Sequence, residues 1–179
     1  LEFRRVLFRS RFINSLGSYT RMPVLALDFD GVLCDSARET GITGWKAAGT
    51  LWEDMAEPLP PLPLLDGYCR ARPVIETGFE AIAMMRLLKD GEDPDDLLES
   101  FPRHLPAAVA RSGTDAAGLK QLYAAIRDGW INEDARGWLS LSPLYPGVAE
   151  ALNAIPPEVE CCIVTTKQER FAAQLLEHN

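Results

Sequence analysis

The chain has 179 residues, of which 47% are apolar, 8% aromatic and 25% charged. A chain of this length can form one domain, or a domain with an insertion, and can bury a sizeable core. Its apolar stretches are short and interrupted by charges, whereas a membrane-spanning helix needs about 18 or more consecutive apolar residues. We therefore expect no membrane segment, and the composition also excludes collagen-like, disulfide-rich and fully disordered classes.

The net charge of −8 is unevenly distributed. Residues 1–21 contain five arginines and one acidic residue, which leaves 13 basic and 25 acidic residues in the rest of the chain. The excess of acidic residues in residues 22–179 disfavours a nucleic acid as the partner. The four cysteines form neither a CxxC nor a Cys/His pattern. We therefore expect reduced thiols in a cytoplasmic protein.

Both ends of the chain are abrupt. Residues 1–10 resemble the translation of a sequencing-library adapter, with an arginine-rich targeting peptide as the alternative. We leave residues 1–21 out of the fold prediction and take Met22 as the expected native start. The helical pattern at the carboxyl end stops without a capping glycine. We expect a fragment truncated at both ends that is poorly soluble or inactive by itself, although the encoded full-length enzyme is active.

The predicted elements alternate between strand and helix. Residues 24–30 form a short apolar run that predicts a buried strand. Pro146 begins a short helical pattern, which is followed by a second strand pattern at 160–166 and a helical pattern at 167–178. This alternation is typical of the parallel sheet of an α/β fold.

Residues 37–144, between the two strands, show several helical patterns and no strand pattern. Prolines, glycines and capping residues interrupt them at 58–63, 91–94 and 112–115. We therefore predict a helical insertion of about a hundred residues, far longer than an ordinary connection in an α/β unit.

The sequence Asp28-Phe29-Asp30-Gly31 closes the first predicted strand, at the end where open α/β sheets bind ligands. Side chains two apart on a strand point the same way, so both carboxylates could face one pocket. Gly31 lacks a Cβ atom and lets backbone N–H groups approach an anion. Neighbouring carboxylates repel each other unless a divalent cation compensates, and Mg²⁺ with its oxygen ligands and waters suits such a site.

Residues 26–36, ALDFDGVLCDS, resemble the first motif of the haloacid dehalogenase superfamily, in which an apolar strand precedes Asp-x-Asp-Gly and a later Asp-Ser. Residues 161–167, CCIVTTK, resemble the second motif, a strand that ends in Thr or Ser, with Thr165 in the motif position. The insertion lies where this family carries its first type of cap domain. The family's third motif, a lysine, and its fourth, an acidic pair, should follow downstream and are absent.

The resemblance implies an α/β fold with an incomplete Rossmann-like three-layer α/β/α core and an inserted α-helical cap. Residues 22–36 and 145–179 would form the core, and residues 37–144 the cap. It also implies a Mg²⁺-dependent phosphatase whose substrate is a small phosphorylated metabolite, because a closed cap excludes water and limits substrate size.

The resemblance assigns roles to individual residues. Asp28 would attack phosphorus and form an aspartyl-phosphate, and Asp30 would act first as general acid and then as general base. The Asp28 carboxylate and the Asp30 carbonyl would ligate Mg²⁺. Thr165 and the backbone of Phe29, Asp30 and Gly31 would hold the phosphoryl oxygens.

Some of these residues have alternative interpretations. Asp30 could form an Asx turn before the glycine, and Thr166 takes the place of Thr165 if the strand register shifts by one. For Asp35 and Ser36, a helix cap is favoured over substrate contact.

Lys167 is a further phosphate-binding candidate, although a lysine in the first turn of a helix is more often solvated. It is not the third-motif lysine, which normally arrives from a later loop. In the predicted cap, the candidate selectivity residues are Trp45, Lys46, Arg72 and Glu76, since arginine suits phosphate and carboxylate groups. Core packing and solvated surface charge are the alternatives for each of these four.

Three other functions remain open at this stage. A sugar-phosphate mutase or a phosphonate hydrolase could use the same scaffold, and a catalytically inactive relative could only bind metabolites or partners. A phospho-accepting receiver domain also forms an aspartyl-phosphate, but the long insertion after the first strand argues against it.

Overall fold

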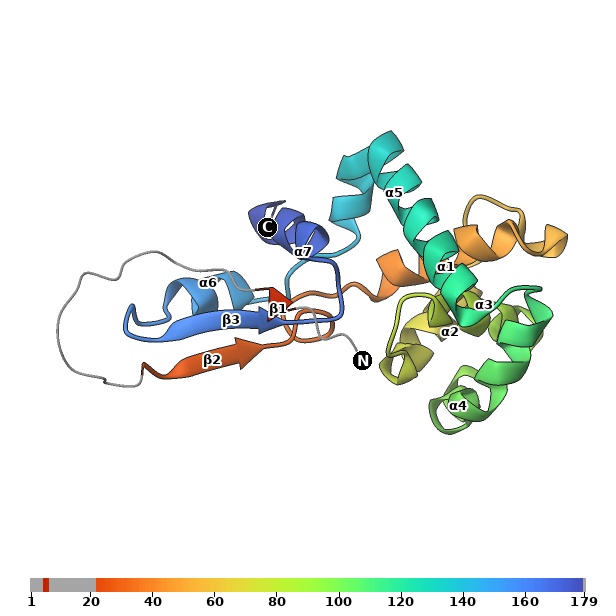
Figure 1. Ribbon diagram of the computed structural model, residues 1–179, viewed down its shortest axis with the longest axis horizontal. Helices are drawn as coiled ribbons and strands as arrows, with labels where there is room; N and C mark the ends of the chain where they lie inside the picture. The colour runs from red at the N-terminus through yellow and green to blue at the C-terminus, as the bar shows by residue number, and fades with distance from the viewer. Residues whose placement is uncertain (1–4, 7–21, 179) are drawn as a thin grey trace. The chain divides into compact units, whose positions relative to one another are not determined.

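The computed structural model describes residues 5–6 and 22–178, which form a mixed α/β structure that is mostly helical (Figure 1). The chain divides into two compact units. The α/β unit consists of Leu1–Ser36 and Ser142–Asn179, and the helical unit consists of Ala37–Leu141. Each unit is described by itself.

The α/β unit contains a three-stranded sheet in the order β1-β3-β2. β2 (Val24–Leu27) and β3 (Glu160–Val164) run parallel, and Leu27 pairs with Ile163. β1 (Arg5–Val6) pairs antiparallel with the other edge of β3. The segment that we left out of the fold prediction therefore contributes a short strand.

The buried strand predicted at residues 24–30 is wrong in two respects: β2 stops at Leu27, and its first three residues are exposed. After Leu27 the chain makes a tight turn. Three successive amides, the last that of Cys34, donate to the carbonyl of Phe29, and Gly31 adopts a φ of 80°. A positive φ is easily reached by glycine alone, so Gly31 permits the turn. The turn places the two aspartates beyond the strand.

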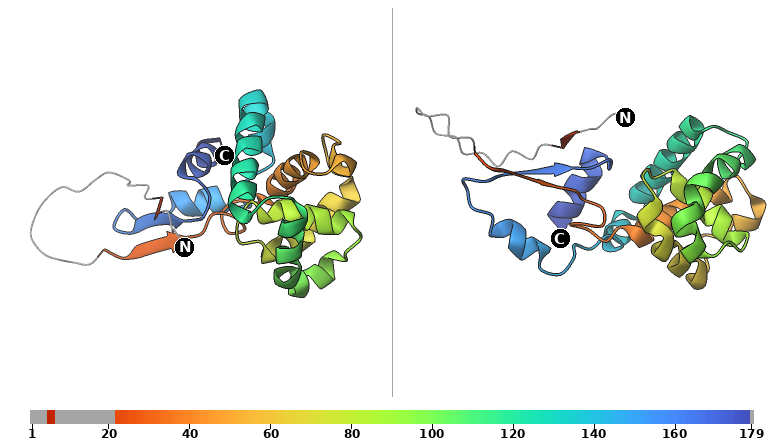
Figure 2. Two further views of the ribbon diagram at one scale, coloured as in Figure 1. Left: turned by 45° about the vertical axis from the view of Figure 1, so that its right-hand side comes forward. Right: turned by 90° about the horizontal axis from the view of Figure 1, so that it is seen from below.

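The described residues of the α/β unit also form two helices, α6 (Val148–Asn153) and α7 (Glu169–His178). The right-hand view of Figure 2 shows both on the same side of β2 and β3. Phe171 and Leu175 lie on one face of α7, as their spacing predicts, and both are buried. The described residues thus form one helical layer on a sheet. The second helical layer of a three-layer core stays a prediction.

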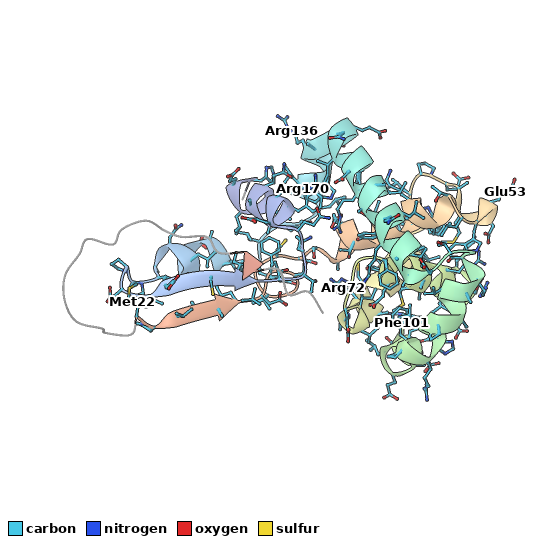
Figure 3. The ribbon with its side chains drawn as sticks, in the orientation of Figure 1. Met22, Glu53, Arg72, Phe101, Arg136 and Arg170 are labelled. Atoms are coloured by element: carbon cyan, nitrogen blue, oxygen red, sulfur yellow. The ribbon has the colours of Figure 1, made fainter. Side chains whose placement is uncertain are left out.

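The helical unit contains five α-helices and two short 3₁₀ helices. They are α1 (Ala37–Gly49), η1 (Glu53–Met55), α2 (Leu62–Ala71), η2 (Arg72–Val74), α3 (Glu80–Lys89), α4 (Pro94–Arg111) and α5 (Ala116–Ser140). Their apolar faces meet in one core, to which α1, α2 and α4 contribute the fully buried Trp45, Tyr68 and Phe101. Phe101 is labelled in Figure 3. The unit begins where the insertion was expected to begin and ends at Leu141 rather than at residue 144.

α4 has no counterpart among the predicted patterns, because Pro102 and Pro106 lie inside it. An interior proline removes a backbone donor and usually breaks a helix. Here the side chain of Asp93 caps the amino end by accepting two backbone N–H groups, and the buried Leu97 and Phe101 anchor the helix to the core. Tertiary packing therefore overrides the local preference.

α5 is the longest helix, and Asp115 caps it by accepting the N–H of Gly118 at 2.8 Å. The helix is kinked at Asp134, where φ is −147° and ψ is 72°. Neither α5 nor any other helix in the described residues is both long and apolar enough to cross a membrane.

Candidate functional site

The two sequence motifs meet at one edge of the α/β unit. Leu27 of β2 pairs with Ile163 of β3. Asp28 comes one residue after this pair on its strand, and Thr165 comes two residues after it on the other strand. Parallel strands present their carboxyl ends at the same edge, which is where ligands bind in open α/β sheets.

Asp28 is exposed in the turn after β2. One of its carboxylate oxygens, Oδ1, accepts the N–H of Phe29 at 2.7 Å. The other oxygen has no hydrogen-bond partner among the described residues. The alternation of side chains along a strand does not orient the two aspartates, since both Asp28 and Asp30 lie beyond β2. We expected the two carboxylates to face one pocket because side chains two apart on a strand point the same way. This reason is wrong, because neither aspartate lies within β2.

The carboxylate of Asp30 is held from two directions. Its Oδ1 accepts a hydrogen bond from the hydroxyl of Ser36 and lies 3.2 Å from the Nζ of Lys167. The side chain of Asp30 is 18% exposed, and that of Lys167 only 2%. A buried ammonium is costly unless it is paired and hydrogen-bonded, so the ion pair explains why the lysine can lie inside the unit.

Lys167 is therefore not solvated, contrary to the usual behaviour of a lysine near a helix start. Its Nζ also lies 5.9 Å from the centroid of the Phe29 ring, which is fully buried. Its backbone N–H donates to the hydroxyl oxygen of Thr165 at 3.1 Å. This local bond closes a turn after β3, so α7 begins at Glu169 rather than at residue 167.

Thr165 is buried, and its hydroxyl oxygen accepts the lysine amide. A hydroxyl carries one donor as well as its lone pairs, so the Thr165 proton remains free to bond to an anion. Thr166, the alternative position, is exposed.

The amides expected to bind phosphate differ in their present partners. The N–H of Phe29 donates to the carboxylate of Asp28, and that of Gly31 donates to the carbonyl of Cys34 at 2.9 Å. The N–H of Asp30 has no partner among the residues that the structure describes. Of the three backbone donors, the one at Asp30 is thus directly available to a ligand.

The oxygen atoms of this turn fit a hard cation. Mg²⁺ prefers carboxylate and carbonyl oxygens and usually keeps several waters. The second carboxylate oxygen of Asp28 and the carbonyl of Asp30 are donors of this kind, and neither has a described partner. Within the described part of the chain, no three His, Cys, Asp or Glu side chains gather closely enough to hold a metal ion. The turn thus offers two oxygen ligands, one from the Asp28 carboxylate and one from the backbone of Asp30.

Ser36 is the contact that the sequence interpretation missed. Its buried hydroxyl donates to Asp30, and the residue also lies directly before α1, where we expected a helix cap. Asp35, its neighbour, is exposed, and its amide donates to the carbonyl of Pro143 at 2.9 Å. The tight turn around Gly31 brings residue 36 back to residue 30, and the glycine after Asp30 was the available signal.

Two of the cap candidates, Trp45 and Lys46, lie on α1. Trp45 is buried in the core of the helical unit, and its indole N–H donates to the carbonyl of Glu57 at 2.7 Å. The Nζ of Lys46 lies 5.1 Å from the centroid of the Trp130 ring. These contacts stabilise the helical unit. The indole N–H of Trp45 is already used, whereas the ammonium of Lys46 can still donate on the side that faces away from the Trp130 ring.

Arg72 is the first residue of η2, and Glu76 follows that helix. The Nη1 of Arg72 donates to the carbonyl of Ile75 at 3.0 Å, and Nε of the same side chain is buried with no partner. Glu76 is exposed, and its backbone N–H donates to the carboxylate of Glu80 at 2.8 Å. Arg72 is thus the cap candidate with an unused donor.

No family model, curated protein or solved structure matches this chain. The chemistry of the strand ends therefore rests on the contacts of Asp28, Asp30, Thr165 and Lys167 themselves.

Proposed function

We propose that this protein is a Mg²⁺-dependent phosphoric monoester hydrolase of the haloacid dehalogenase superfamily, which acts on a small phosphorylated metabolite. The observation that carries the proposal is the ion pair between Lys167 and Asp30, with 3.2 Å between Nζ and Oδ1. This pair joins the segment after β3 to the turn after β2, so residues of both motifs act at one place.

In this proposal the α/β unit is part of a Rossmann-like three-layer core, and the helical unit is a cap inserted after the first strand. The support is the parallel pairing of β2 with β3 and the all-helical segment between them. The chain leaves the α/β unit after Ser36 and returns at Ser142, as an insertion requires.

Asp28 is the nucleophile. An oxygen of its carboxylate forms a bond to phosphorus while the bond from phosphorus to the ester oxygen breaks, which leaves an aspartyl-phosphate and an alcohol. The exposure of Asp28 and its unpartnered carboxylate oxygen support this role, because an attacking oxygen must reach the substrate.

Asp30 is the general acid and base. It gives a proton to the departing ester oxygen and later accepts one from the water that attacks the aspartyl-phosphate, a role worth about 10²–10⁴-fold in rate. The bonds from Ser36 and Lys167 support this assignment, since they hold the carboxylate in one orientation. Ser36 and Lys167 are therefore positioning residues for Asp30.

The phosphoryl oxygens bind to the free N–H of Asp30 and to the hydroxyl of Thr165, with the positive charge of Lys167 nearby. Fixed donors of this kind stabilise the charge that spreads over the phosphoryl oxygens in the transition state. When bound, Mg²⁺ would neutralise negative charge on the phosphate, and the Asp28 carboxylate and the Asp30 carbonyl would be its protein ligands.

The test is the release of inorganic phosphate from a panel of phosphate monoesters, with Mg²⁺ and with EDTA, by a chain that also carries the family's third-motif lysine and fourth-motif acidic pair. We expect Mg²⁺-dependent release that Asp28→Asn abolishes. Glu158→Gln, which changes an exposed acid of the same unit, should retain full activity. Activity that survives in Asp28→Asn, or that is unaffected by EDTA, would overturn the proposal.

A further inference from the structure

We propose that the helical unit contains a carboxylate-binding site, formed by the Nε and Nη2 edge of Arg72 together with the hydroxyl of Thr77. The site lies wholly within the helical unit, and it does not depend on the proposed hydrolase activity. It would bind a carboxylate of a small ligand.

The first observation is that Nε and Nη2 of Arg72 have no hydrogen-bond partner among the described residues. Arg72 is labelled in Figure 3. Its guanidinium makes one hydrogen bond, from Nη1 to the carbonyl of Ile75 at 3.0 Å. Nε is buried without a partner, Nη2 donates to no described residue, and no described carboxylate lies within ion-pair distance of this arginine. A buried donor that loses water without gaining a partner costs about 1–3 kcal/mol. A ligand atom at this edge would remove that cost.

In Arg127, the corresponding Nε and Nη2 atoms both have hydrogen-bond partners. Its Nε donates to Oε1 of Glu39 at 2.9 Å, and its Nη2 donates to Oε2 at 3.0 Å. This is the two-bond arrangement that arginine forms with a planar carboxylate. Arg72 presents the corresponding edge without the acid, so its complement is a carboxylate that the described residues do not supply.

The second observation is the hydroxyl of Thr77, which is also buried without a partner. Thr77 follows Ile75, the residue whose carbonyl anchors the Arg72 guanidinium, by two positions. Two residues of extended chain span at most about 7 Å, so the backbone that carries the free hydroxyl lies close to the carbonyl that holds the guanidinium. Two orphaned buried donors in one short segment indicate a missing acceptor.

The segment between η2 and α3 is held in place before any ligand arrives. The buried carboxylate of Glu80 accepts the backbone N–H groups of Glu76 at 2.8 Å and of Thr77 at 3.2 Å. Gly78 packs so closely against α5 that an added Cβ would come within 2.5 Å of the Tyr123 ring. A site built on a rigid segment loses little conformational entropy on binding.

The surrounding charges favour a carboxylate over a phosphate dianion. Glu80 is buried nearby with its carboxylate bound to the backbone, and the exposed Glu76 lies between Arg72 and Thr77 in the sequence. These acids repel a dianion about twice as strongly as a single negative charge. A group with one charge and two coplanar oxygens therefore matches both the electrostatics and the arginine edge.

The test follows the Nε–H resonance of Arg72 by ¹⁵N NMR in the full chain, with EDTA present and with acetate as the ligand. The resonance is assigned through bonds and checked with Arg72→Lys. We expect a saturable shift of this resonance with acetate and none with neutral acetamide. The Nε–H of Arg70, an exposed arginine on α2, is the internal control and should not move in a saturable way.

Thr77→Val should weaken acetate binding about fivefold, as expected for the loss of one hydrogen bond. Asp28→Asn should leave the binding unchanged, and this separates the carboxylate site from the proposed hydrolase site. A shift that does not saturate, or an equal response to acetamide, would mean that water completes the site and would overturn the proposal. Tighter binding of inorganic phosphate than of acetate would overturn the assignment to carboxylates.

Discussion

The Nζ of Lys167 lies 3.2 Å from the Oδ1 of Asp30, and the whole helical unit separates these two residues in the sequence. The lysine side chain is almost completely buried, whereas Asp30 keeps some exposure. This ion pair connects the turn after β2 to the segment after β3. It therefore holds the two segments that follow the carboxyl ends of the parallel strands next to each other.

Lys167→Met should lower the free energy of unfolding of the α/β unit by about 1–3 kcal/mol, because Asp30 loses its charged partner. The cost stays below the 3–5 kcal/mol of a fully buried orphaned charge, since water reaches Asp30. Urea titration measures the change. Lys167→Arg, which retains the positive charge, should be less destabilised, and equal loss in the two variants would show that the charge is not what matters.

Glu39→Gln should destabilise the helical unit by about 3–5 kcal/mol, because it leaves the buried Arg127 without its counter-ion. Glu39 is fully buried, and its Oε1 also accepts the indole N–H of Trp138 at 2.9 Å. Thermal or urea unfolding provides the measurement, with Glu53→Gln as an exposed control.

A double-mutant cycle adds a sharper test of this buried pair. Glu39→Gln combined with Arg127→Met should cost less than the sum of the single changes, because no uncompensated charge remains. Additive losses would contradict a direct interaction between the two side chains.

Asp90 should make the helical unit sensitive to acid. Its hydrogen bond from Arg86 is the main cause of a lowered pKa, and Arg111 contributes in the same direction. Because the pKa of Asp90 is lower in the folded state than the value near 3.9 in an unfolded chain, its stabilising effect is present above about pH 4 and is lost as the pH falls through the folded-state pKa.

Asp90→Asn should therefore lower the free energy of unfolding by about 1 kcal/mol at pH 7, the upper end of the range for a solvent-screened ion pair, with a difference from the parent that shrinks below about pH 4. Unfolding curves across this pH range measure it. Asp66→Asn is the matched control, because Asp66 pairs with Arg38 at an exposed site where an ion pair contributes only about 0–1 kcal/mol. A pH-independent difference for Asp90→Asn would contradict the prediction.

Gly78→Ala should destabilise the helical unit by about 1–3 kcal/mol, since the added methyl group meets the Tyr123 ring of α5. Gly129→Ala, on the same α5, meets no atom within 4 Å and should instead stabilise the helix by about 0.5–1 kcal/mol. The two midpoints of thermal unfolding should move in opposite directions, and a shift of both in the same direction would be inconsistent with this packing.

Local patterns in the sequence were sufficient for the elements whose signals lie within a few residues. The apolar runs at β2 and β3, the alternation with helices, and the helical character of the long intervening segment all follow from side-chain periodicity and turn residues. The same patterns were insufficient for α4, because two prolines contradict a helix locally and only the burial of Leu97 and Phe101 outweighs them.

The candidate site divides in the same way. The sequence by itself determined that Asp28, Asp30 and Thr165 come at the ends of two strands, because the residue types and their spacing are local. Only the tertiary structure decided that Lys167 is buried against Asp30, that Ser36 turns back to the same carboxylate, and that Arg72 keeps an unused edge. Burial and ion pairing depend on which distant segments the chain brings together, and no local pattern encodes that distance.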